Sequence, residues 1–332
     1  MAQMKYFYEL TISSSPHAHS PVTTQTIMRD VLIALIPAML GSIYFFGFRS
    51  LLVTLVSAAA CVFFEWGFCK IRKLHCKTYD LSAVVTGVLL AFVCPVTIPY
   101  WTIILGDFFA IVLVKMLFGG LGKNIVNPAL AGRAFLFSWP VLMSNWVKVG
   151  FDNAAGLLST ADAVTAATPM SAMHQGALPE ESILDMFLGN IGGCIGETSA
   201  LLLIIGFAYL LYRKVITARI PLAYIGTVAI LAFLFPQGND RIAWMAAQVF
   251  GGGLMLGAIF MATDYVTSPL TKLGQIVYGI GCGIITILIR YFGGYSEGVT
   301  YAILCMNACA VLLDKIGRPV KFGAPKKEAA KK

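Results

Sequence analysis

Hydroxyl side chains and one carboxylate are concentrated in a short segment near the middle of the chain. The segment reads Ser159-Thr160-Ala161-Asp162-Ala163-Val164-Thr165-Ala166-Ala167-Thr168-Pro169. Small residues followed by a proline are typical of a loop that ends in a turn. On composition alone, its threonine hydroxyls would bond to nearby backbone groups.

Ionisable side chains also interrupt several apolar stretches. Arg133 would lie more than one turn inside a helix, and a charge at that depth usually has a functional or a paired structural role. Acids occur in or beside other apolar stretches, namely Glu65, Asp107, Glu197 and Asp264. Carboxylate oxygens suit a hard cation in transit, but each acid could equally be a polar anchor, so no ion pathway is assigned.

Two amides and two histidines complete the groups that could do chemistry. Asn124 and Asn127 lie in a Gly-rich approach to a helix, where their side chains could bond the edge of a heteroaromatic ring. Asn127 precedes Pro128, so helix capping is an equal alternative. His17 and His19 are two residues apart in the N-terminal lead, and this spacing alone does not predict a metal site. None of the eight cysteines forms a C-x-x-C pair, so no iron–sulfur signature is present.

The composition places these groups in a membrane protein. Of the 332 residues, 58% are hydrophobic and only 12% are charged, and the mean hydropathy is +0.80. A soluble protein of this length could not bury so much apolar surface in one core. The net charge of +8 arises from basic residues in short loops and the tail, which indicates charge sidedness and contact with lipid rather than binding of nucleic acid. The lead lacks the pattern of a cleaved signal peptide, so no processing is expected.

Ten apolar stretches are long enough to be candidate spans. They cover 30–48, 50–70, 81–96, 99–118, 128–146, 197–213, 219–236, 243–262, 273–291 and 299–314. All are predicted to be helices, because lipid excludes open sheet edges and unsatisfied backbone groups. The predicted fold class is therefore an all-α polytopic membrane protein. Residues 183–192 are predicted to form a further short helix at the membrane interface.

The distribution of charge predicts the orientation. With the N-terminus in the cytoplasm and ten alternating spans, 20 of the 24 Lys and Arg residues fall on the cytoplasmic side. This agrees with the positive-inside rule and places both termini in the cytoplasm. The long segment 147–196, with its five acids and one lysine, then faces the outer side.

The two halves of the chain contain a similar element at corresponding places. Leu117-Phe118-Gly119-Gly120 ends the fourth predicted span, and Tyr291-Phe292-Gly293-Gly294 ends the ninth. Coincidence is an alternative in a chain with 32 glycines, but the matching span order favours two inverted five-helix repeats. The predicted regions are a cytoplasmic lead (1–29), a first repeat (30–146), an external loop (147–196), a second repeat (197–314) and a basic tail (315–332).

The hydroxyl-rich loop resembles the flavinylation motif of membrane flavoproteins, Asp-x-x-Thr-x-Ala-Thr. Its positions are filled by Asp162, Thr165, Ala167 and Thr168. The resemblance implies that a flavin transferase joins the phosphate of FMN to the Thr168 hydroxyl, and that Asp162 and Thr165 are read by the transferase. Many members of the family have glycine where this chain has Ala163 and Ala166, but alanine is also small.

The similarity extends from about residue 5 to 320. It is carried by several stretches, namely Ser15-Pro16-His17, Ile27-Met28-Arg29-Asp30-Val31, 119–129, Gly132-Arg133-Ala134-Phe135, Gly196-Glu197-Thr198-Ser199, Ala262-Thr263-Asp264, Thr267-Ser268-Pro269 and 293–298. These resemble the D-type membrane subunit of the Rnf complex, the ion-translocating ferredoxin:NAD oxidoreductase. They are also similar to the B-type membrane subunit of the sodium-pumping NADH:quinone reductase.

The resemblance implies a membrane subunit of a redox-driven Na+ or H+ pump in the bacterial inner membrane. Electrons would pass between ferredoxin and NAD through covalent FMN, with riboflavin near Asn124 and Asn127 as a second, noncovalent flavin. Partner subunits would supply the iron–sulfur centres, further flavin and the NAD site, so this chain would not be catalytic alone and no catalytic residue or metal ligand is assigned. The alternative function is a solute transporter or channel with an inverted-repeat fold and no flavin.

Overall fold

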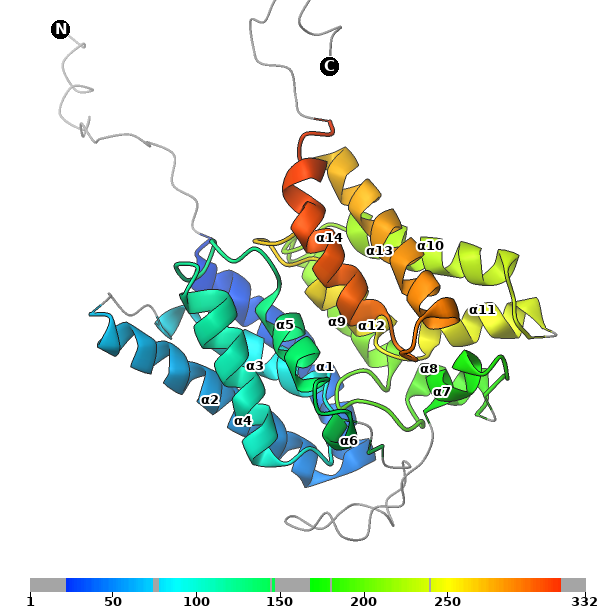
Figure 1. Cartoon of the computed structure of the whole chain (residues 1–332), viewed down its shortest axis with the longest axis horizontal. Helices are drawn as coiled ribbons and strands as arrows, with labels where there is room; N and C mark the ends of the chain where they lie inside the picture. The colour runs from blue at the N-terminus through cyan, green and yellow to red at the C-terminus, as the bar shows by residue number, and fades with distance from the viewer. Residues whose placement is uncertain are drawn as a thin grey trace, which may run out of the picture.

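The computed structural model describes residues 22–73, 78–143, 145–146, 168–179, 181–238 and 240–317. Every regular element in these ranges is a helix, as predicted for an all-α protein. In chain order they are α1 (Thr24–Phe46), α2 (Phe48–Ile71), η1 (Thr78–Asp80), α3 (Ser82–Phe92), α4 (Tyr100–Phe108), η2 (Phe109–Met116), α5 (Pro128–Leu136), α6 (Pro140–Met143), α7 (Pro169–His174), α8 (Ile183–Leu188), α9 (Ala200–Tyr212), α10 (Arg219–Leu234), α11 (Arg241–Phe250), α12 (Leu254–Leu256), η4 (Gly257–Met261), α13 (Lys272–Phe292) and α14 (Val299–Leu313). Figure 1 shows their arrangement.

Each of the ten predicted stretches contains at least one of these helices, and the chain is a multi-pass membrane protein. By length and composition, α1, α2 and α13 could each cross a bilayer, and the bent pair from Arg241 to Met261 is a fourth candidate. The other apolar helices of at least ten residues are shorter, namely α3, α9, α10 and α14. The predicted interfacial helix at 183–192 is found as α8, which Ser182 caps by accepting a hydrogen bond from the Asp185 N–H.

The prediction of one continuous helix over 243–262 is wrong. The two parts of this stretch, Arg241–Phe250 and Leu254–Met261, meet at a bend of 58°. The break lies at Gly251-Gly252-Gly253, where Gly252 has a left-handed φ of 65°. A Cβ atom on Gly253 would lie 2.3 Å from Glu197 Oε2. The glycines therefore end the helix and also admit carboxylates close to the backbone.

The single helix predicted over 128–146 also needs correction, whereas the stretch 99–118 is helical from Tyr100 to Met116. α5 ends at Leu136, and α6 begins four residues later at Pro140. Pro140 has no N–H group and disfavours a helical conformation at Trp139, so the helix is interrupted there. The fourth predicted stretch begins as α4 and continues as a wider π-helical segment, η2.

Packing joins each half of the chain internally and then joins the two halves. α2 packs on α3 and α4, and α10 packs on α11 and α13. Contacts of α1 with α9 and of α5 with α14 hold the halves together, which are the blue-to-teal and the yellow-green-to-red regions of Figure 1. The main apolar core is shared between them, with Phe92 and Leu203 as members from either half.

The contact between α1 and α9 gives a prediction about a single glycine. A Cβ atom on Gly206 would lie 2.3 Å from the Ala34 carbonyl oxygen, whereas one on Gly226 would meet nothing within 4 Å. Gly206→Ala should therefore destabilise the chain by about 1–3 kcal/mol. The control Gly226→Ala should stabilise it by about 0.5–1 kcal/mol, because alanine is the better helix former. Unfolding of the two variants in detergent measures this, and equal effects would contradict the close approach of the two helices.

Candidate functional site

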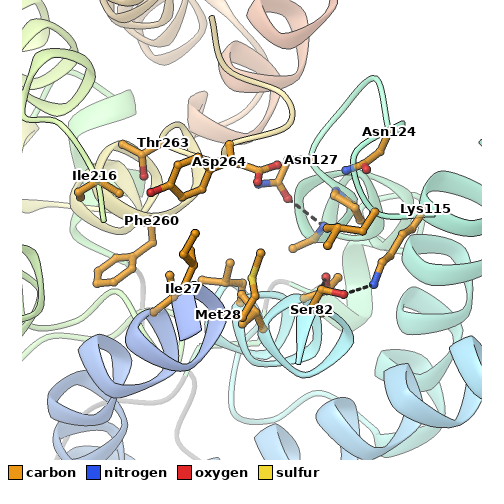
Figure 2. A pocket seen from close by; sticks show the side chains of 18 of the residues that line it. Ile27, Met28, Ser82, Lys115, Asn124, Asn127, Ile216, Phe260, Thr263 and Asp264 are labelled. Carbon is orange, nitrogen blue, oxygen red and sulfur yellow. Dashed lines mark hydrogen bonds between the residues drawn. The ribbon is translucent and has the colours of Figure 1, made fainter. Parts of the chain in front are cut away.

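A cavity that we call the Asn124 cavity lies where the start of α1 meets α3, η2, the loop before α5 and the segment after η4. Its polar wall includes Ser82, Lys115, Asn124, Asn127 and Asp264, which Figure 2 shows around the opening. About 740 Å³ of space, its opening to solvent included, lies between its atoms. A mostly apolar lining with few polar groups is typical of a site for a small organic molecule.

The structure separates the two asparagines that the sequence left as equal candidates. Asn127 caps α5, because its Oδ1 accepts hydrogen bonds from the N–H groups of Ala129 and Leu130 at 3.0 and 3.4 Å. Its Nδ2 donates to the Met261 carbonyl at 3.2 Å. By contrast, Asn124 is buried and its Oδ1 has no hydrogen-bond partner. Capping is therefore confirmed for Asn127, and Asn124 is the amide with an unused acceptor in the cavity wall.

A second cavity, the Thr168 cavity, is formed by the residues around the start of α7, the loop before α9 and the turn before α14. Thr168 occupies the N-cap position of α7, yet its side chain makes no capping hydrogen bond. Its carbonyl oxygen instead accepts from the Ser171 N–H and hydroxyl at 2.9 and 2.7 Å. The Thr168 hydroxyl is thus free of the helix cap, and Glu197 and Glu297 line the same cavity.

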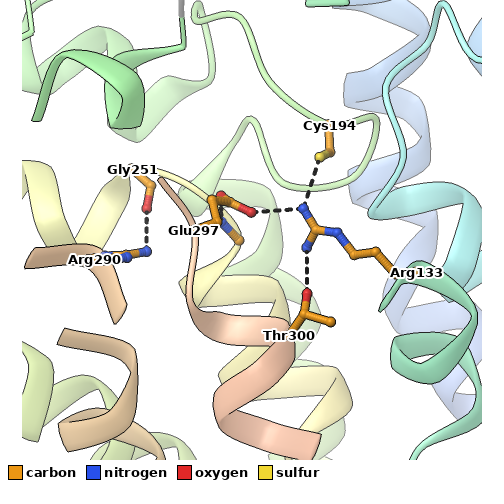
Figure 3. A network of polar contacts seen from close by, with 7 residues as sticks. Arg133, Cys194, Gly251, Arg290, Glu297 and Thr300 are labelled. Carbon is orange, nitrogen blue, oxygen red and sulfur yellow. Dashed lines mark hydrogen bonds and ion pairs between the residues drawn. The ribbon is translucent and has the colours of Figure 1, made fainter. Parts of the chain in front are cut away.

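Buried charges form a network beside this cavity, shown in Figure 3. Arg133, only 1% exposed, projects from α5 and pairs through Nη2 with Glu297 Oε2 at 2.8 Å. It also donates to the hydroxyl of Thr300 at 3.2 Å and to the sulfur of Cys194 at 3.6 Å. Arg133 therefore connects the N-terminal half to the C-terminal half, and its charge is paired, as expected of a charge inside a helix.

The other oxygen of Glu297 fixes the glycine break. Glu297 Oε1 accepts a hydrogen bond from the Gly253 N–H at 2.7 Å. Arg290, on α13, donates hydrogen bonds to Gln248 and to the Gly251 carbonyl. These bonds join α13 to the end of α11. Glu197 is 5% exposed, and its Oε2 has no hydrogen-bond partner. This end of the molecule thus presents one neutralised carboxylate and one carboxylate with an unused oxygen beside Thr168.

Comparison with known proteins assigns the chain to a family. The sequence profile described as "NQR2, RnfD, RnfE family" matches residues 11–323. The chain belongs to the NQR2, RnfD, RnfE family. This match agrees with the resemblance to the D-type subunit of the Rnf complex, and it covers the Asn124 cavity, Thr168 and Arg133 together.

Three relatives of the chain are named as subunits of ion-translocating oxidoreductase complexes. The D-type subunit of the Na(+)-translocating ferredoxin:NAD(+) oxidoreductase complex of Acetobacterium woodii is 45% identical over 96% of each chain. The proton-translocating counterpart of Clostridium ljungdahlii is 44% identical over 94% of this chain and 96% of the relative. The D-type subunit of the ion-translocating oxidoreductase complex of Actinobacillus succinogenes is 34% identical over 93% and 96%, respectively. Identity alone therefore favours neither cation.

Three of the four motif positions recognised from this family, Asp162, Thr165 and Ala167, lie outside the described residues, as do His17 and His19. The flavinylation motif as a whole thus stays a prediction. Within the described ranges, no group of three or more His, Cys, Asp or Glu side chains is placed to hold a metal ion.

The remaining acids of this family member have different surroundings. Asp264 accepts a hydrogen bond from the Thr267 hydroxyl at 3.0 Å. Asp107 is fully buried and accepts from Ser57 at 2.7 Å and from the thiol of Cys61 at 3.2 Å. Asp264 borders the Asn124 cavity, whereas Asp107 lies within the packing of α2 and α4.

Sequence reasoning missed Lys115 as a residue of the Asn124 cavity. The distribution of charge counts Lys115 among the basic residues on the cytoplasmic side, but it is 2% exposed and forms an ion pair with Glu65 at 3.0 Å. A lysine within the apolar stretch 99–118 was the available signal, because intramembrane charges are rare and paired.

Proposed function

We propose that this chain is the D-type subunit of an ion-translocating ferredoxin:NAD oxidoreductase complex and carries electrons through FMN joined to Thr168. The family assignment supports the complex. The observation that carries the flavin proposal is the Thr168 hydroxyl, which does not cap its helix and borders a cavity. A solute transporter would share the apolar helices but would carry no flavin on this hydroxyl.

The residues around Thr168 fit a tethered flavin. Trp146, Ile191 and Met170 provide apolar surface for a planar ring. Arg133 neutralises Glu297 and so limits the repulsion between the cavity wall and a phosphoester. A covalent tether would prevent loss of the cofactor from an exposed site, and Thr168 would be an attachment point without a role in proton transfer.

We assign a second, noncovalent flavin to the Asn124 cavity, for which riboflavin is our candidate. The buried and unpartnered Asn124 Oδ1 would accept a hydrogen bond from the ring N–H of the isoalloxazine. Riboflavin has no phosphate and is uncharged, so it would need no further cation in the cavity. Asn127 would shape the cavity mainly through its cap on α5. A flavin, when bound, supplies one- and two-electron transfer, while the protein sets its orientation and local charge.

The architecture that we propose is two inverted five-helix repeats. The packing of α2 on α3 and α4 has its counterpart in α10 on α11 and α13, and the contacts α1–α9 and α5–α14 join the corresponding helices. In the bacterial inner membrane, the start of α1 and the end of α14 would face the cytoplasm. Figure 1 draws α6, α7 and α8 at the opposite end, in agreement with an outer position for Thr168.

The proposal requires other subunits. The sequence contains no C-x-x-C pair and no G-x-G-x-x-G fingerprint, so partners would carry the iron–sulfur centres and the NAD site. A flavin transferase would be needed for maturation. In-gel ultraviolet fluorescence of the denatured chain, purified from a host with that transferase, tests the function directly. A dark band from such a host would overturn the flavin proposal and favour a transporter.

Asn124→Ala should lower the content of noncovalent flavin in the purified chain by about tenfold or more. The variant removes the unused buried acceptor, and one hydrogen bond in a buried site is worth about 1–2 kcal/mol. Flavin released by acid and quantified by chromatography is the measurement. Ile125→Ala is the matched control, since Ile125 is exposed and does not border the cavity. Equal flavin in both variants would contradict the assignment of Asn124.

A further inference from the structure

A series of hydrogen bonds, which we call the Lys115 series, connects the neighbouring elements η1, α3, η2 and α2. Lys115 Nζ lies 3.0 Å from Glu65 Oε1 and donates to the Ser82 hydroxyl at 2.6 Å. The Ser82 hydroxyl in turn donates to Asp80 Oδ1, also at 2.6 Å. Ser82, Lys115 and Glu65 are all buried. The Lys115 series thus has a carboxylate at each end and one ammonium group between them.

The two carboxylates of the Lys115 series border a different cavity from its ammonium and hydroxyl groups. Lys115 and Ser82 line the Asn124 cavity, and Figure 2 shows their hydrogen bond at its edge. Glu65 and Asp80 line another cavity, which we call the Glu65 cavity. The Glu65 cavity has about 1460 Å³ of space, its mouth included, and reaches the surface beside the exposed residues Thr24 and Tyr79. Leu121 borders both cavities, so the Lys115–Glu65 pair and Leu121 separate them.

The ion pair leaves one acceptor unused. Glu65 Oε2 is buried and has no hydrogen-bond partner, although Oε1 is paired with Lys115. A purely structural buried ion pair is stabilised when its remaining lone pairs are also satisfied. The unused oxygen of Glu65 can instead receive a proton while Oε1 keeps its contact with Lys115.

The carboxylates that face Lys115 can accept a proton to replace one that Lys115 gives up. Glu65 from α2 and Asp80, through Ser82, face it within the Lys115 series, and Asp264 faces it across the Asn124 cavity. Asp107 from α4 is directed to Ser57 and Cys61 instead. After Lys115 gives up its proton, the buried Glu65 carboxylate is left without its cation, and a proton on its unused oxygen neutralises it.

We propose that Lys115 and Glu65 relay protons from the Glu65 cavity to an electron-accepting heteroaromatic ring in the Asn124 cavity. This relay rests on the proposed presence of a noncovalent flavin there. Reduction of the ring by an electron carrier of the complex would make it basic, and an N–H bond of the Lys115 ammonium would then break, with its proton moving to the ring. Glu65 then takes a proton from water on its own side and passes it to the Lys115 amine. One proton enters from solvent, and both side chains return to their charged forms.

The test uses the full chain with Thr168→Ala, so that added riboflavin is its only flavin. An electron pulse reduces the bound riboflavin, and its protonation is followed by visible absorbance. Glu65→Gln should slow protonation by about 10²-fold, the usual contribution of a general acid or base, without weakening riboflavin binding. Lys115→Arg should have the same effect, because arginine keeps the charge but does not release its proton. The exposed residue Lys123 provides the control Lys123→Met, which should leave the rate unchanged.

Each outcome decides between the two proposals. If the parent chain binds no riboflavin, the second flavin is overturned and the relay with it. If riboflavin binds and both variants protonate it at the parental rate, the relay alone is overturned. A merely structural role predicts full activity in Lys115→Arg, whereas the relay predicts retained binding with slow protonation. If Lys115→Arg does not fold, Glu65→Gln, which is nearly isosteric, decides by the same two measurements.

Discussion

Thr168→Ala should abolish the flavin that remains on the chain after denaturation. The alanine has no hydroxyl to form a phosphoester, and the described structure offers no other role for the Thr168 side chain, which does not cap α7. In-gel fluorescence should fall to background, and electron transfer through the assembled complex should be lost. The fold should be retained, because the Thr168 carbonyl and not its side chain bonds Ser171.

Thr160→Ala is the matched control for this variant. It removes a hydroxyl from the same segment, eight residues earlier, at a position outside the flavinylation motif. Its fluorescence should equal that of the parent chain. Fluorescence in both variants would show that another residue bears the flavin. Peptide mass mapping around residue 168 would then give the site directly.

Arg133→Met should destabilise the chain by about 3–5 kcal/mol, the second large effect that we expect. The substitution leaves Glu297 without its partner, and removal of one member of a buried ion pair costs about that much. It also removes the contacts of α5 with Thr300 and Cys194. Unfolding in detergent, followed by loss of helical circular dichroism, measures the effect. The exposed residue Arg241 gives the control Arg241→Met, for which a change within about 0.5 kcal/mol is expected.

The double variant Arg133→Met with Glu297→Gln isolates the ion pair. Neutral glutamine still accepts the Gly253 N–H, so the second substitution should recover part of the lost stability. Purely additive losses in the cycle would mean that the two side chains are not coupled, contrary to their separation of 2.8 Å. The result also bears on Thr168, because Glu297 lines its cavity.

The family assignment does not decide which ion the complex would pump. Relatives of nearly equal identity are named as sodium-translocating and proton-translocating. A proton relay to the Asn124 cavity would serve flavin chemistry in either case, so the relay is separate from the choice of the pumped ion. Comparing riboflavin protonation with and without Na+ in the parent chain would reveal any link between them.

Local features of the sequence were sufficient to predict the helices and some of their ends. The length and hydropathy of the apolar stretches predicted α2 and α13, because a helix in lipid satisfies its own backbone groups wherever its neighbours lie. Asn127 before Pro128 made a helix cap one of two equal predictions, and that one is confirmed, since capping depends on residues two or three positions apart. The same reasoning placed Thr168 in a loop and Arg133 inside a helix.

Tertiary structure alone decided the partners of the buried charges and the shape of the cavities. Glu297 binds Arg133 from 164 positions away, and Lys115 meets Glu65 from a different helix. These pairings depend on which helix faces pack together, and local periodicity carries no information about a partner in another helix. The bend at Gly251–Gly253 also depends on a distant residue, because Glu297 accepts a hydrogen bond from the Gly253 N–H. The oxygen of Asn124 is unused because no distant segment places a donor beside it.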